Sequence, residues 1–311
     1  MNWHIKAALQ KILALSQIGD RLNHMPVLFN KKYHSNVYQY QTYECFRKFE
    51  ESKIQIDETS NALEIGTGYS VLSPVCLALL GFNKVVTVDI SRDLTFSSFR
   101  KQIEFMQVSS LPRDFVSKSI YSEIVLKQKI ENIKKVRSFD ELFEYLNIVY
   151  LAAYKFEEIE KESLKFDYIV SQVVLEHMPP KQLELLFFYT KKWLSENGIA
   201  VHCINFIDHF ANPGFFQDKS ISEFNFLKYS DKYWDFWSGN SIAYTNRLSF
   251  PYYVQLAKKY NLNVKSFNGE NYRKRVELDT ELIHPDILRK YNGVVNKDEI
   301  MKYQRGTFVM S

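Results

Sequence analysis

Two glycines and an acid in the segment from Ala62 to Ser70 have the residue types and spacing of a ligand-binding turn after a strand. Gly66 and Gly68 can adopt backbone angles that are closed to other residues, and they leave room for a ligand to approach the main chain. Glu64 precedes them and could accept hydrogen bonds or offset the charge of an ammonium or sulfonium ligand. Because this acid would repel a dinucleotide phosphate, the turn favours a positively charged nucleoside ligand.

A second acid lies where a ribose would need it. The stretch from Val85 to Asp89 predicts a strand, and its final carboxylate follows Gly66 by 23 residues. A βαβ unit delivers an acid to ribose hydroxyls at about this distance. The alternative for this aspartate is a solvated strand end or a cap for the turn at Ser91. The dinucleotide fingerprint G-x-G-x-x-G/A is excluded, because Val71 occupies its last small position.

A third segment, from Phe166 to Met178, reads FDYIVSQVVLEHM. With the glycine turn and Asp89, it resembles the class I S-adenosylmethionine-dependent methyltransferases, whose fourth strand and following loop are usually seen as F-D-x-V-x-S-x-x-V-L-E-H. The resemblance covers most of residues 62–260. It implies S-adenosylmethionine as methyl donor, S-adenosylhomocysteine as product, and a boundary between cofactor and acceptor in the loop that ends at His177.

The predicted cofactor site combines the glycine turn, the strand-end acid and the positions implied by the resemblance. Its members are Glu64, Gly66, Thr67, Gly68, Asp89, Ile90, Ala152, Ser171 and Gln172. Two features depart from the family pattern: Ser70 stands where many members have a third glycine, and no acid occurs at residues 152–154 after the third strand. An adenine contact in that loop is therefore expected from backbone or stacking.

Strands and helices alternate from residue 62 to residue 206 and must position these residues. The alternation predicts an α/β fold with a doubly wound, mostly parallel sheet, which in the resembled family is the Rossmann-like methyltransferase fold. Strands are expected at 85–89, 146–151 and 199–206, besides those that start at 62 and 166, and helices at 71–81, 96–106, 122–135 and 181–194. The predicted domains are a helical N-terminal extension (1–58), an S-adenosylmethionine-binding domain (59–206, with an insertion at about 94–145), and a C-terminal acceptor-binding cap that completes the sheet (207–311).

Two histidines are candidates for proton transfer on the acceptor side. His209 could take the proton of a hydroxyl as the methyl group transfers, and Asp208 could orient the imidazole or bind a sugar hydroxyl. Adjacent residues on an extended chain point in opposite directions, so these two need not cooperate. His177 is the third catalytic candidate, but it and Glu176 could instead be a packed histidine and a helix-start carboxylate.

Four further residues are candidates for acceptor binding: Asp218, Lys219, Asn246 and Arg247. The aspartate and the lysine could hold a polar acceptor, and the arginine could clamp a carboxylate or phosphate. Alternatively, these three could form an internal ion-pair network that fixes the cap. This region resembles a subgroup of bacterial methyltransferases found with sugar and surface-polysaccharide biosynthesis, so a sugar hydroxyl is the predicted acceptor.

The composition favours a globular cytoplasmic enzyme. The chain has 311 residues, 46% of them hydrophobic, and contains no run of 18 apolar residues and no secretory signal at its start. Its net charge is only +4 and its basic residues are interspersed with acids, so nucleic acid is not expected as a substrate.

No metal is expected from spacing along the chain. The three cysteines are odd in number and widely separated, which indicates reduced thiols rather than disulfides or a zinc pattern. Asp208, His209 and Asp218 could supply ligands, but their spacing is unspecific.

Two segments could contact partners. Residues 3–18 place an apolar stripe along one predicted helix with Lys6 and Lys11 beside it. Such a helix could lie on a membrane surface, although packing against the catalytic domain or a second subunit is favoured because its basic charge is slight. The aromatic segment 229–237, which includes Trp234, predicts core or interface packing.

The sequence therefore predicts methyl transfer to a small-molecule or glycan acceptor. One alternative is another use of the same cofactor, such as aminocarboxypropyl transfer, which the product mass would distinguish. A second is a non-catalytic binding or assembly subunit that has kept the fold, which absence of cofactor binding would favour.

Overall fold

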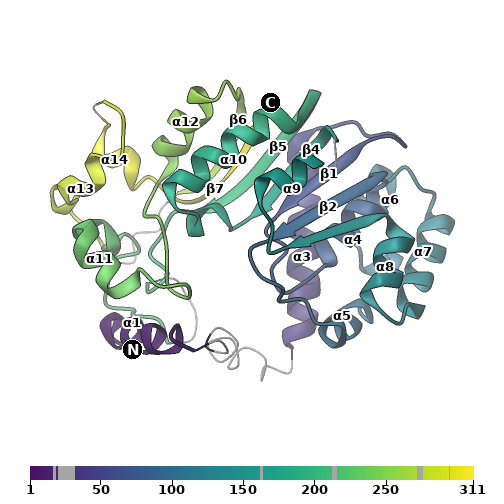
Figure 1. Cartoon of the computed structure of the whole chain (residues 1–311), viewed down its shortest axis with the longest axis horizontal. Helices are drawn as coiled ribbons and strands as arrows, with labels where there is room; N and C mark the ends of the chain where they lie inside the picture. Colours follow the sequence, from purple (N-terminus) through teal and green to yellow (C-terminus); the bar gives the residue numbers. More distant parts are fainter. Residues whose placement is uncertain (17–18, 20–31, 162–163, 212–215, 272–275, 294) are drawn as a thin grey trace. The chain divides into compact units, whose positions relative to one another are not determined.

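The computed structural model describes residues 1–16, 19, 32–161, 164–211, 216–271, 276–293 and 295–311. The chain forms two compact units, whose helices and strands are labelled in Figure 1. The glycine-loop unit comprises Lys31–Gln172, Tyr189–His202 and Val309–Ser311. The histidine unit comprises Met1–Asn30, Val173–Phe188 and Cys203–Phe308.

The glycine-loop unit alternates strands with helices. In chain order its elements are α3 (Tyr33–Ser52), β1 (Asn61–Ile65), α4 (Leu72–Leu80), β2 (Lys84–Asp89), α5 (Phe96–Ile103), η1 (Val108–Ser110), α6 (Phe115–Lys118), α7 (Glu123–Lys135), α8 (Phe139–Leu146), β3 (Ile148–Ala152), α9 (Phe156–Lys161) and β4 (Phe166–Gln172). Three elements have residues in both units: α10 (Pro180–Trp193), β5 (Leu194–Asn205) and β7 (Tyr303–Met310). The histidine unit also contains α1 (Trp3–Leu13), η2 (Leu175–His177), η3 (Asn225–Lys228), α11 (Asp231–Ser238), α12 (Phe250–Lys259), β6 (Val264–Asn271), η4 (Thr280–Leu282), α13 (Pro285–Leu288) and α14 (Lys297–Ile300).

The sheet has seven strands in the order β3-β2-β1-β4-β5-β7-β6. β1 pairs in parallel with β2 and β4, and β2 pairs in parallel with β3. Ile65 at the end of β1 lies opposite Val88 of β2 and Ser171 of β4, so these three strands end at the same edge. The predicted doubly wound, mostly parallel fold is confirmed. Its carboxyl edge carries both the glycine turn and Asp89, as ligand sites in such sheets do.

Helix α4 explains the apolar run that follows the glycine turn. Every residue from Leu72 to Leu80 is buried, and the helix packs with β1 and β2 in the core of the glycine-loop unit. Gly81 ends the helix with a φ of 121°, a conformation that strains any residue with a side chain. This buried helix packs against β2 and thereby helps to fix the strand that ends at Asp89.

Two predicted boundaries near the insertion differ by a few residues. β3 begins at Ile148 rather than at 146, because Leu146 is still the last residue of α8. Asn147 caps that helix in a left-handed conformation with a φ of 52°. Helix α5 ends at Ile103 rather than at residue 106.

The boundary between α10 and β5 also lies earlier than predicted. The helix ends at Trp193, and the strand runs through Asn197 and Gly198, before its predicted start at residue 199. A Cβ at position 198 would lie 2.8 Å from the carbonyl oxygen of Phe166. The glycine is therefore needed for close approach to the neighbouring backbone and not to end a helix.

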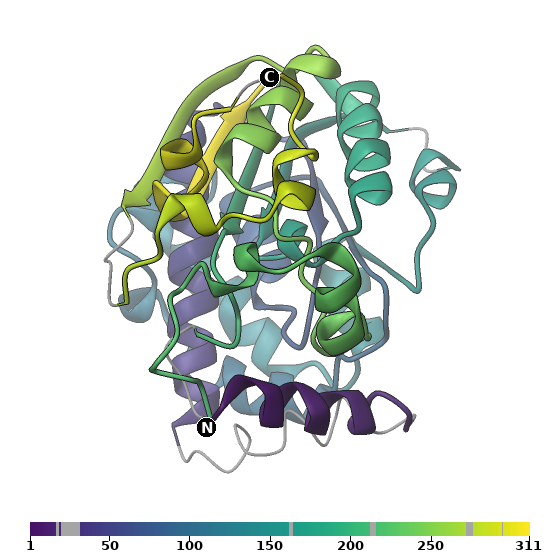
Figure 2. The same cartoon turned by 90° about the vertical axis from the view of Figure 1, so that its left-hand side faces the viewer.

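In the histidine unit, α1 lies beside α11, as Figures 1 and 2 both show. Trp3 and Ala7 are buried there, and the Trp3 ring lies 5.7 Å from that of Trp234, which confirms that Trp234 belongs to a core. Three apolar side chains of the predicted stripe remain exposed: Ile5, Leu9 and Ile12. Its last two members, Gln17 and Ile18, lie outside the described residues.

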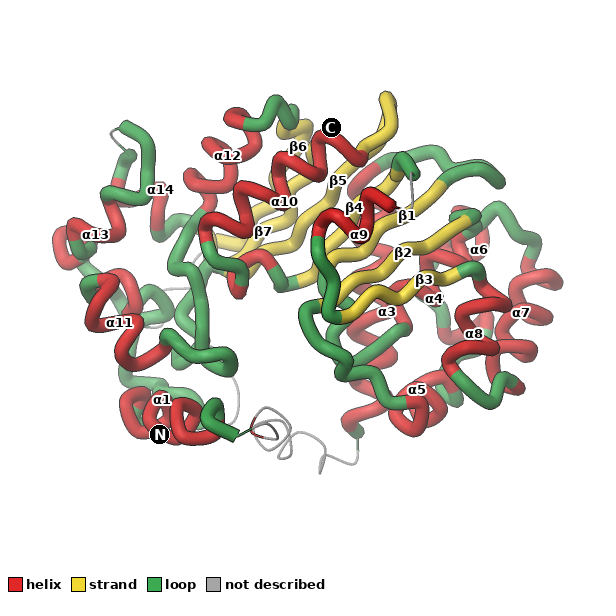
Figure 3. The backbone as a smooth tube through the Cα atoms, in the orientation of Figure 1, coloured by secondary structure: helices red, strands yellow, loops and turns green. Residues whose placement is uncertain are grey.

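Between β5 and α11 the described chain is mostly loop (Figure 3), and this loop carries His209 and Asp218. No helix in the described part of the chain combines the length and apolarity that a bilayer crossing requires.

Candidate functional site

The glycine turn has the backbone that the sequence predicts. Gly66 and Gly68 have φ values of 86° and 62°, in the left-handed region that favours glycine. The N–H groups of Gly66 and Thr67 donate to the carbonyl of Val88 at 2.8 and 3.2 Å. The N–H of Gly68 donates to Oδ2 of Asp89 at 2.7 Å. The turn is thereby fixed against the end of β2.

Asp89 and its neighbour present a carboxylate next to an apolar surface. Oδ1 of Asp89 accepts from the N–H of Ser91 at 3.3 Å, and Oδ2 accepts from Gly68. Burial raises the pKa of this carboxyl, although the amides of Gly68, Ser91 and Ile90 favour its charged form. The side chain of Ile90 is 77% exposed. A carboxylate for a ribose and an exposed aliphatic side chain for a purine are the groups that a nucleoside needs.

The loop after β3 is fixed to the same strand end through its backbone. The N–H of Tyr154 donates to the carbonyl of Asp89 at 3.1 Å. Nε of Arg92 donates to the carbonyl of Ala152 at 2.6 Å. The alanine side chain itself is buried, so an adenine contact in this loop stays a prediction that would involve backbone or stacking.

Three of the predicted cofactor residues direct their side chains into the unit. Glu64 is 5% exposed and accepts from the Thr87 hydroxyl at 2.8 Å, and burial raises the pKa of its carboxyl. The Thr67 and Thr87 hydroxyls lie 2.6 Å apart. The Ser171 hydroxyl lies 2.8 Å from Nδ1 of His202. These groups support the strand ends, and side-chain contact with a cofactor remains a prediction for them.

Gln172 at the end of β4 is tied to α3 by a polar group that the sequence analysis missed. Its Oε1 accepts from Nζ of Lys48 at 2.5 Å, and its Nε2 donates to Tyr40 at 2.8 Å and Glu44 at 3.2 Å. Lys48 is only 2% exposed. Burial and the charge of this lysine lower the pKa of His202 to about 3. A single lysine in a polar helix belongs to no sequence motif. The contact of Lys48 with Gln172 is therefore seen only in the folded structure.

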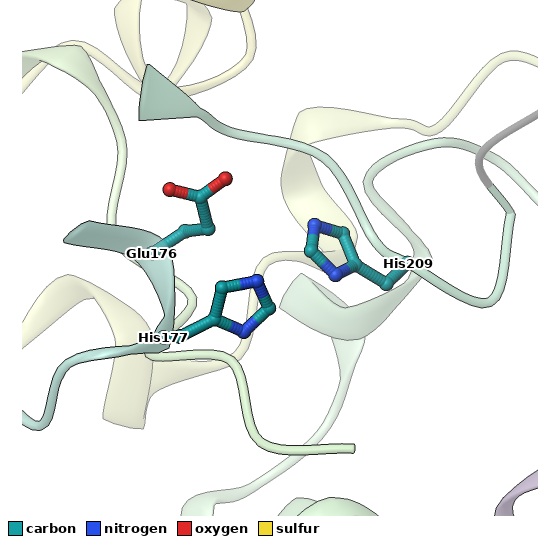
Figure 4. A group of neighbouring side chains, drawn as sticks. All are labelled: Glu176, His177 and His209. Atoms are coloured by element: carbon teal, nitrogen blue, oxygen red, sulfur yellow. The ribbon is translucent and has the colours of Figure 1, made fainter. Parts of the chain in front are cut away.

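Two imidazoles and a carboxyl meet in the histidine unit (Figure 4). Glu176 and His177 lie in η2 directly after β4, and His209 follows β5. The two imidazole centroids are 4.9 Å apart. Nδ1 of His177 lies 3.0 Å from the carbonyl oxygen of Tyr244. Because a carbonyl only accepts, Nδ1 carries the proton and Nε2 keeps a lone pair.

All three groups are expected to be uncharged near neutral pH. Burial raises the pKa of the Glu176 carboxyl to about 8, with partial opposition from nearby amides and from Arg305. Burial lowers the pKa of His209 to about 3. Loss of hydration within the surrounding protein also lowers the pKa of His177, although part of this side chain remains exposed to solvent. Neutral imidazoles can accept a proton or bind a metal ion.

Asn246, predicted to bind the acceptor, instead clamps the turn that carries this cluster. Its Nδ2 donates to the carbonyls of Leu175 at 2.7 Å and Met178 at 3.0 Å. Its backbone N–H donates to the carbonyl of Glu176 at 2.9 Å. Asn246 is 3% exposed, so the structure gives it a positioning role.

Asp208 is fully buried and does not pair with the neighbouring imidazole. Its Oδ1 accepts from the N–H of Phe210 at 2.8 Å, and burial raises its pKa to about 7. Nε2 of His209 lies 3.4 Å from Nδ2 of Asn205. No contact within the described residues joins Asp208 to His209, so the predicted orienting role is not seen.

The remaining predicted acceptor residues do not form one group. Asp218 accepts from the N–H of Trp3 at 2.9 Å at the start of α1. Lys219 is exposed. Arg247 is 3% exposed and bonds to two backbone carbonyls and to Asp231. Within the described residues no contact links Asp218, Lys219 and Arg247, so the predicted three-residue network is not formed, and acceptor binding by these residues stays a prediction.

These features coincide with a known family. A family model described as a methyltransferase domain matches residues 37–266. The chain therefore belongs to this methyltransferase family. The left-handed glycine turn, Asp89 and the exposed Ile90 fit S-adenosylmethionine, the methyl donor that the sequence resemblance implies. A search of curated proteins finds no match to the chain.

Several solved structures are similar to the chain. Phosphoethanolamine N-methyltransferase 2 of Haemonchus contortus, in complex with S-adenosylmethionine, is 13% identical with a TM-score of 0.39 over 91% of this chain and 58% of its own. A cyclopropane-fatty-acyl-phospholipid synthase-like protein of Lactobacillus casei is 12% identical, with a TM-score of 0.46 over 88% and 92%. A putative methyltransferase of Haloferax volcanii, in complex with a Trm112 activator, is 10% identical, with a TM-score of 0.44 over 90% and 93%. The chain thus spans little more than half the length of the Haemonchus enzyme.

Gly68→Ala is expected to weaken cofactor binding as well as to strain the turn. The left-handed backbone costs an alanine about 1–2 kcal/mol. A Cβ at this position meets no atom within 4 Å, so it would project into the space left for the ligand. Titration calorimetry with S-adenosylhomocysteine should show an affinity loss of at least about tenfold, or 1.4 kcal/mol. Gly293→Ala is the matched control, since Gly293 also has a positive φ and open space but lies in the histidine unit. Equal affinity in both variants would contradict the placement.

Proposed function

We propose that this enzyme methylates a hydroxyl of a small polar acceptor, a sugar used in glycan biosynthesis. The observation that carries the proposal is the neutral His177 imidazole, whose Nδ1–H is engaged by Tyr244 and whose Nε2 lone pair is available. An acceptor hydroxyl must lose a proton during methyl transfer, and the donor site proposed at Asp89 would leave that task to His177.

The chain's own residues would bind, orient and accept the proton. Bound S-adenosylmethionine supplies an electrophilic methyl group: its carbon–sulfur bond breaks with the electron pair left on sulfur, the acceptor oxygen forms the new bond, and the hydroxyl proton leaves. Asp89 would accept from the ribose hydroxyls, and Ile90 would pack on the purine. Nε2 of His177 would take the hydroxyl proton. Most of the rate would come from positioning, and the base would contribute about 10²- to 10⁴-fold.

A cavity in the histidine unit suits a sugar-sized acceptor. It has a volume of about 370 Å³ and is lined by aromatic and polar side chains that include Trp234, Tyr244 and Tyr252. Trp234 and Thr245 belong to its lining, although Nε1 of Trp234 and Oγ1 of Thr245 are themselves buried. Aromatic faces can stack on sugar rings, and polar side chains of the lining would bind hydroxyls.

Mass spectrometry of reactions with candidate sugars and nucleotide sugars tests the proposal. A product heavier than the acceptor by one methyl group is expected, with S-adenosylhomocysteine formed in equal amount. A product heavier by an aminocarboxypropyl group would show the alternative use of the cofactor. Methylation only of amines or lipids would overturn the sugar assignment.

His177→Gln is expected to lower kcat about 100-fold while leaving S-adenosylhomocysteine affinity within about twofold of the wild type. Glutamine keeps the size of the side chain but offers no comparable base. His284→Gln is the control, because His284 caps α13 in the same unit. A wild-type kcat in His177→Gln would contradict the proposal that His177 takes the hydroxyl proton.

The cellular setting is part of the same proposal. The three cysteines, Cys45, Cys76 and Cys203, are all free and buried, which suits the reducing cytoplasm. The exposed Ile5, Leu9 and Ile12 on α1 would supply a peripheral membrane or homo-oligomer contact.

A further inference from the structure

Three groups of metal-ligand type lie together in the histidine unit. Glu176, His177 and His209 each offer a ligand atom, and these atoms all lie within 4.8 Å of one another. Figure 4 shows the two imidazoles side by side with the Glu176 side chain next to them. At a tetrahedral ion with bonds of about 2.1 Å, two ligand atoms lie about 3.4 Å apart, so the cluster would need to contract by up to about 1.4 Å.

The burial of Glu176 suits a carboxylate that binds a cation. This side chain is 3% exposed, and neither carboxyl oxygen has a hydrogen-bond partner within the described residues. A buried carboxyl without hydrogen-bond partners destabilises the fold unless a ligand or an ion binds its oxygens. Arg305 contributes positive charge nearby, but it does not bond to these oxygens in the structure.

The environment of His177 matches that of a metal-binding histidine. Its Nδ1–H donates to the carbonyl of Tyr244, which fixes the tautomer and leaves the Nε2 lone pair for a ligand. Histidines that bind metals usually make such a bond with the other ring nitrogen. Asn246 holds the same turn through two bonds from its amide, so Glu176 and His177 are kept in a preformed arrangement.

We propose that Glu176, His177 and His209 bind one divalent transition-metal ion. Two imidazole nitrogens and one carboxylate oxygen favour ions such as Zn²⁺, Co²⁺, Mn²⁺ or Fe²⁺ over Mg²⁺ and Ca²⁺, which prefer oxygen alone. Three protein ligands leave a coordination position open, as at catalytic sites. This open position would take the acceptor hydroxyl and favour its ionised form, a role that rests on the proposed function. With the ion bound, Nε2 of His177 would act as a metal ligand and would no longer take the proton itself. Sequence spacing gave no sign of the site, since His209 comes from a separate segment.

Metal titration of the full chain, freed of metal by chelator and dialysis, tests the proposal. Co²⁺ should bind with one ion per chain and give visible d–d absorption, and Zn²⁺ should displace it. Glu176→Gln, His177→Gln and His209→Gln should each weaken Co²⁺ binding by more than the roughly 10- to 100-fold lost with a second-shell contact. Glu184→Gln and His284→Gln, in the same unit but outside the cluster, should bind like the wild type.

The outcomes separate this inference from the proposed function. Failure of the wild type to bind Co²⁺ or Zn²⁺, or unchanged binding in Glu176→Gln, would overturn the metal site. Because glutamine matches glutamate in size, that variant tests the site even if a histidine variant does not fold. S-adenosylhomocysteine affinity and methyl transfer, measured on the same samples, test the function independently. If the protein bound the metal but methylated no sugar, the sugar assignment would be wrong and the metal site would stand.

Discussion

Replacing Asp89 with alanine is expected to lower the affinity for S-adenosylhomocysteine by at least about 100-fold. The carboxylate would accept two ribose hydroxyls, and hydrogen bonds to a charged group contribute about 1.5–3 kcal/mol each. The loss is therefore about 3 kcal/mol or more, and tenfold in affinity corresponds to 1.4 kcal/mol. The variant also removes the 2.7 Å bond that fixes the N–H of Gly68, so the turn itself loses its anchor. Titration calorimetry measures the effect.

The fold should tolerate this change, because burial raises the pKa of Asp89 and its charge is therefore unfavourable to the folded state. Asp89→Asn separates the two roles, since its amide oxygen can still accept from Gly68 but its NH₂ cannot accept from a ribose. Asp140→Asn, an exposed position on α8 in the same unit, controls for lost charge. Wild-type affinity in both Asp89 variants would contradict the site.

Arg247→Met is expected to destabilise the histidine unit by about 3 kcal/mol. The guanidinium donates to the buried carbonyl of Phe226 at 3.0 Å and to that of Tyr229 at 2.7 Å. It also pairs with Asp231, which Lys290 contacts as well at 2.9 Å. Methionine fills similar space but leaves two carbonyls without a donor, at about 1–3 kcal/mol each. Urea denaturation monitored by tryptophan fluorescence reports the change, since Trp234 lies 5.6 Å from the guanidinium.

The matched control is Arg289→Met. Arg289 also pairs with an aspartate, Asp286, but its side chain is 72% exposed, so its loss should change stability by less than about 1 kcal/mol. If Arg247→Met kept wild-type stability and lost only turnover, the arginine would be an acceptor clamp after all. Cofactor affinity should be unchanged at temperatures where the variant is folded, because Asp89 and the glycine turn belong to the other unit.

The cofactor side was predictable because its signals are local. One βαβ unit contains the turn at Gly66 and Gly68 and the acid at Asp89, so spacing along the chain determines spacing in the fold. The left-handed φ values and the hydrogen bond from Gly68 to Asp89 confirm the predicted turn geometry, and its contact with the cofactor stays a prediction. The inward direction of Glu64 was not predictable, because the position of an acid at a strand end does not reveal whether Thr87 will bind it.

The acceptor side was predicted poorly because its residues acquire their roles only through tertiary packing. Asn246 and Arg247 are polar residues in a loop, and the same types could bind a ligand or satisfy buried backbone groups. Both side chains are 3% exposed and satisfy backbone carbonyls, so the structure shows the second role, whereas acceptor contact stays a prediction. His209 approaches His177 because β4 and β5 are neighbours in the sheet, and the N–H of Val173 donates to the carbonyl of Cys203 at 2.8 Å. The pairing of β4 with β5 cannot be predicted from the residues near His177 or His209 in the sequence.

A crystal structure of the protein with S-adenosylhomocysteine tests the central claim most directly. We predict that the ribose hydroxyls lie within hydrogen-bond distance of the Asp89 carboxylate, the purine packs on Ile90, and the amino acid portion lies beside Gly66 and Gly68. Density for the ligand at any other place, or none at saturating ligand concentration, would contradict the assignment of this strand edge as the methyl-donor site.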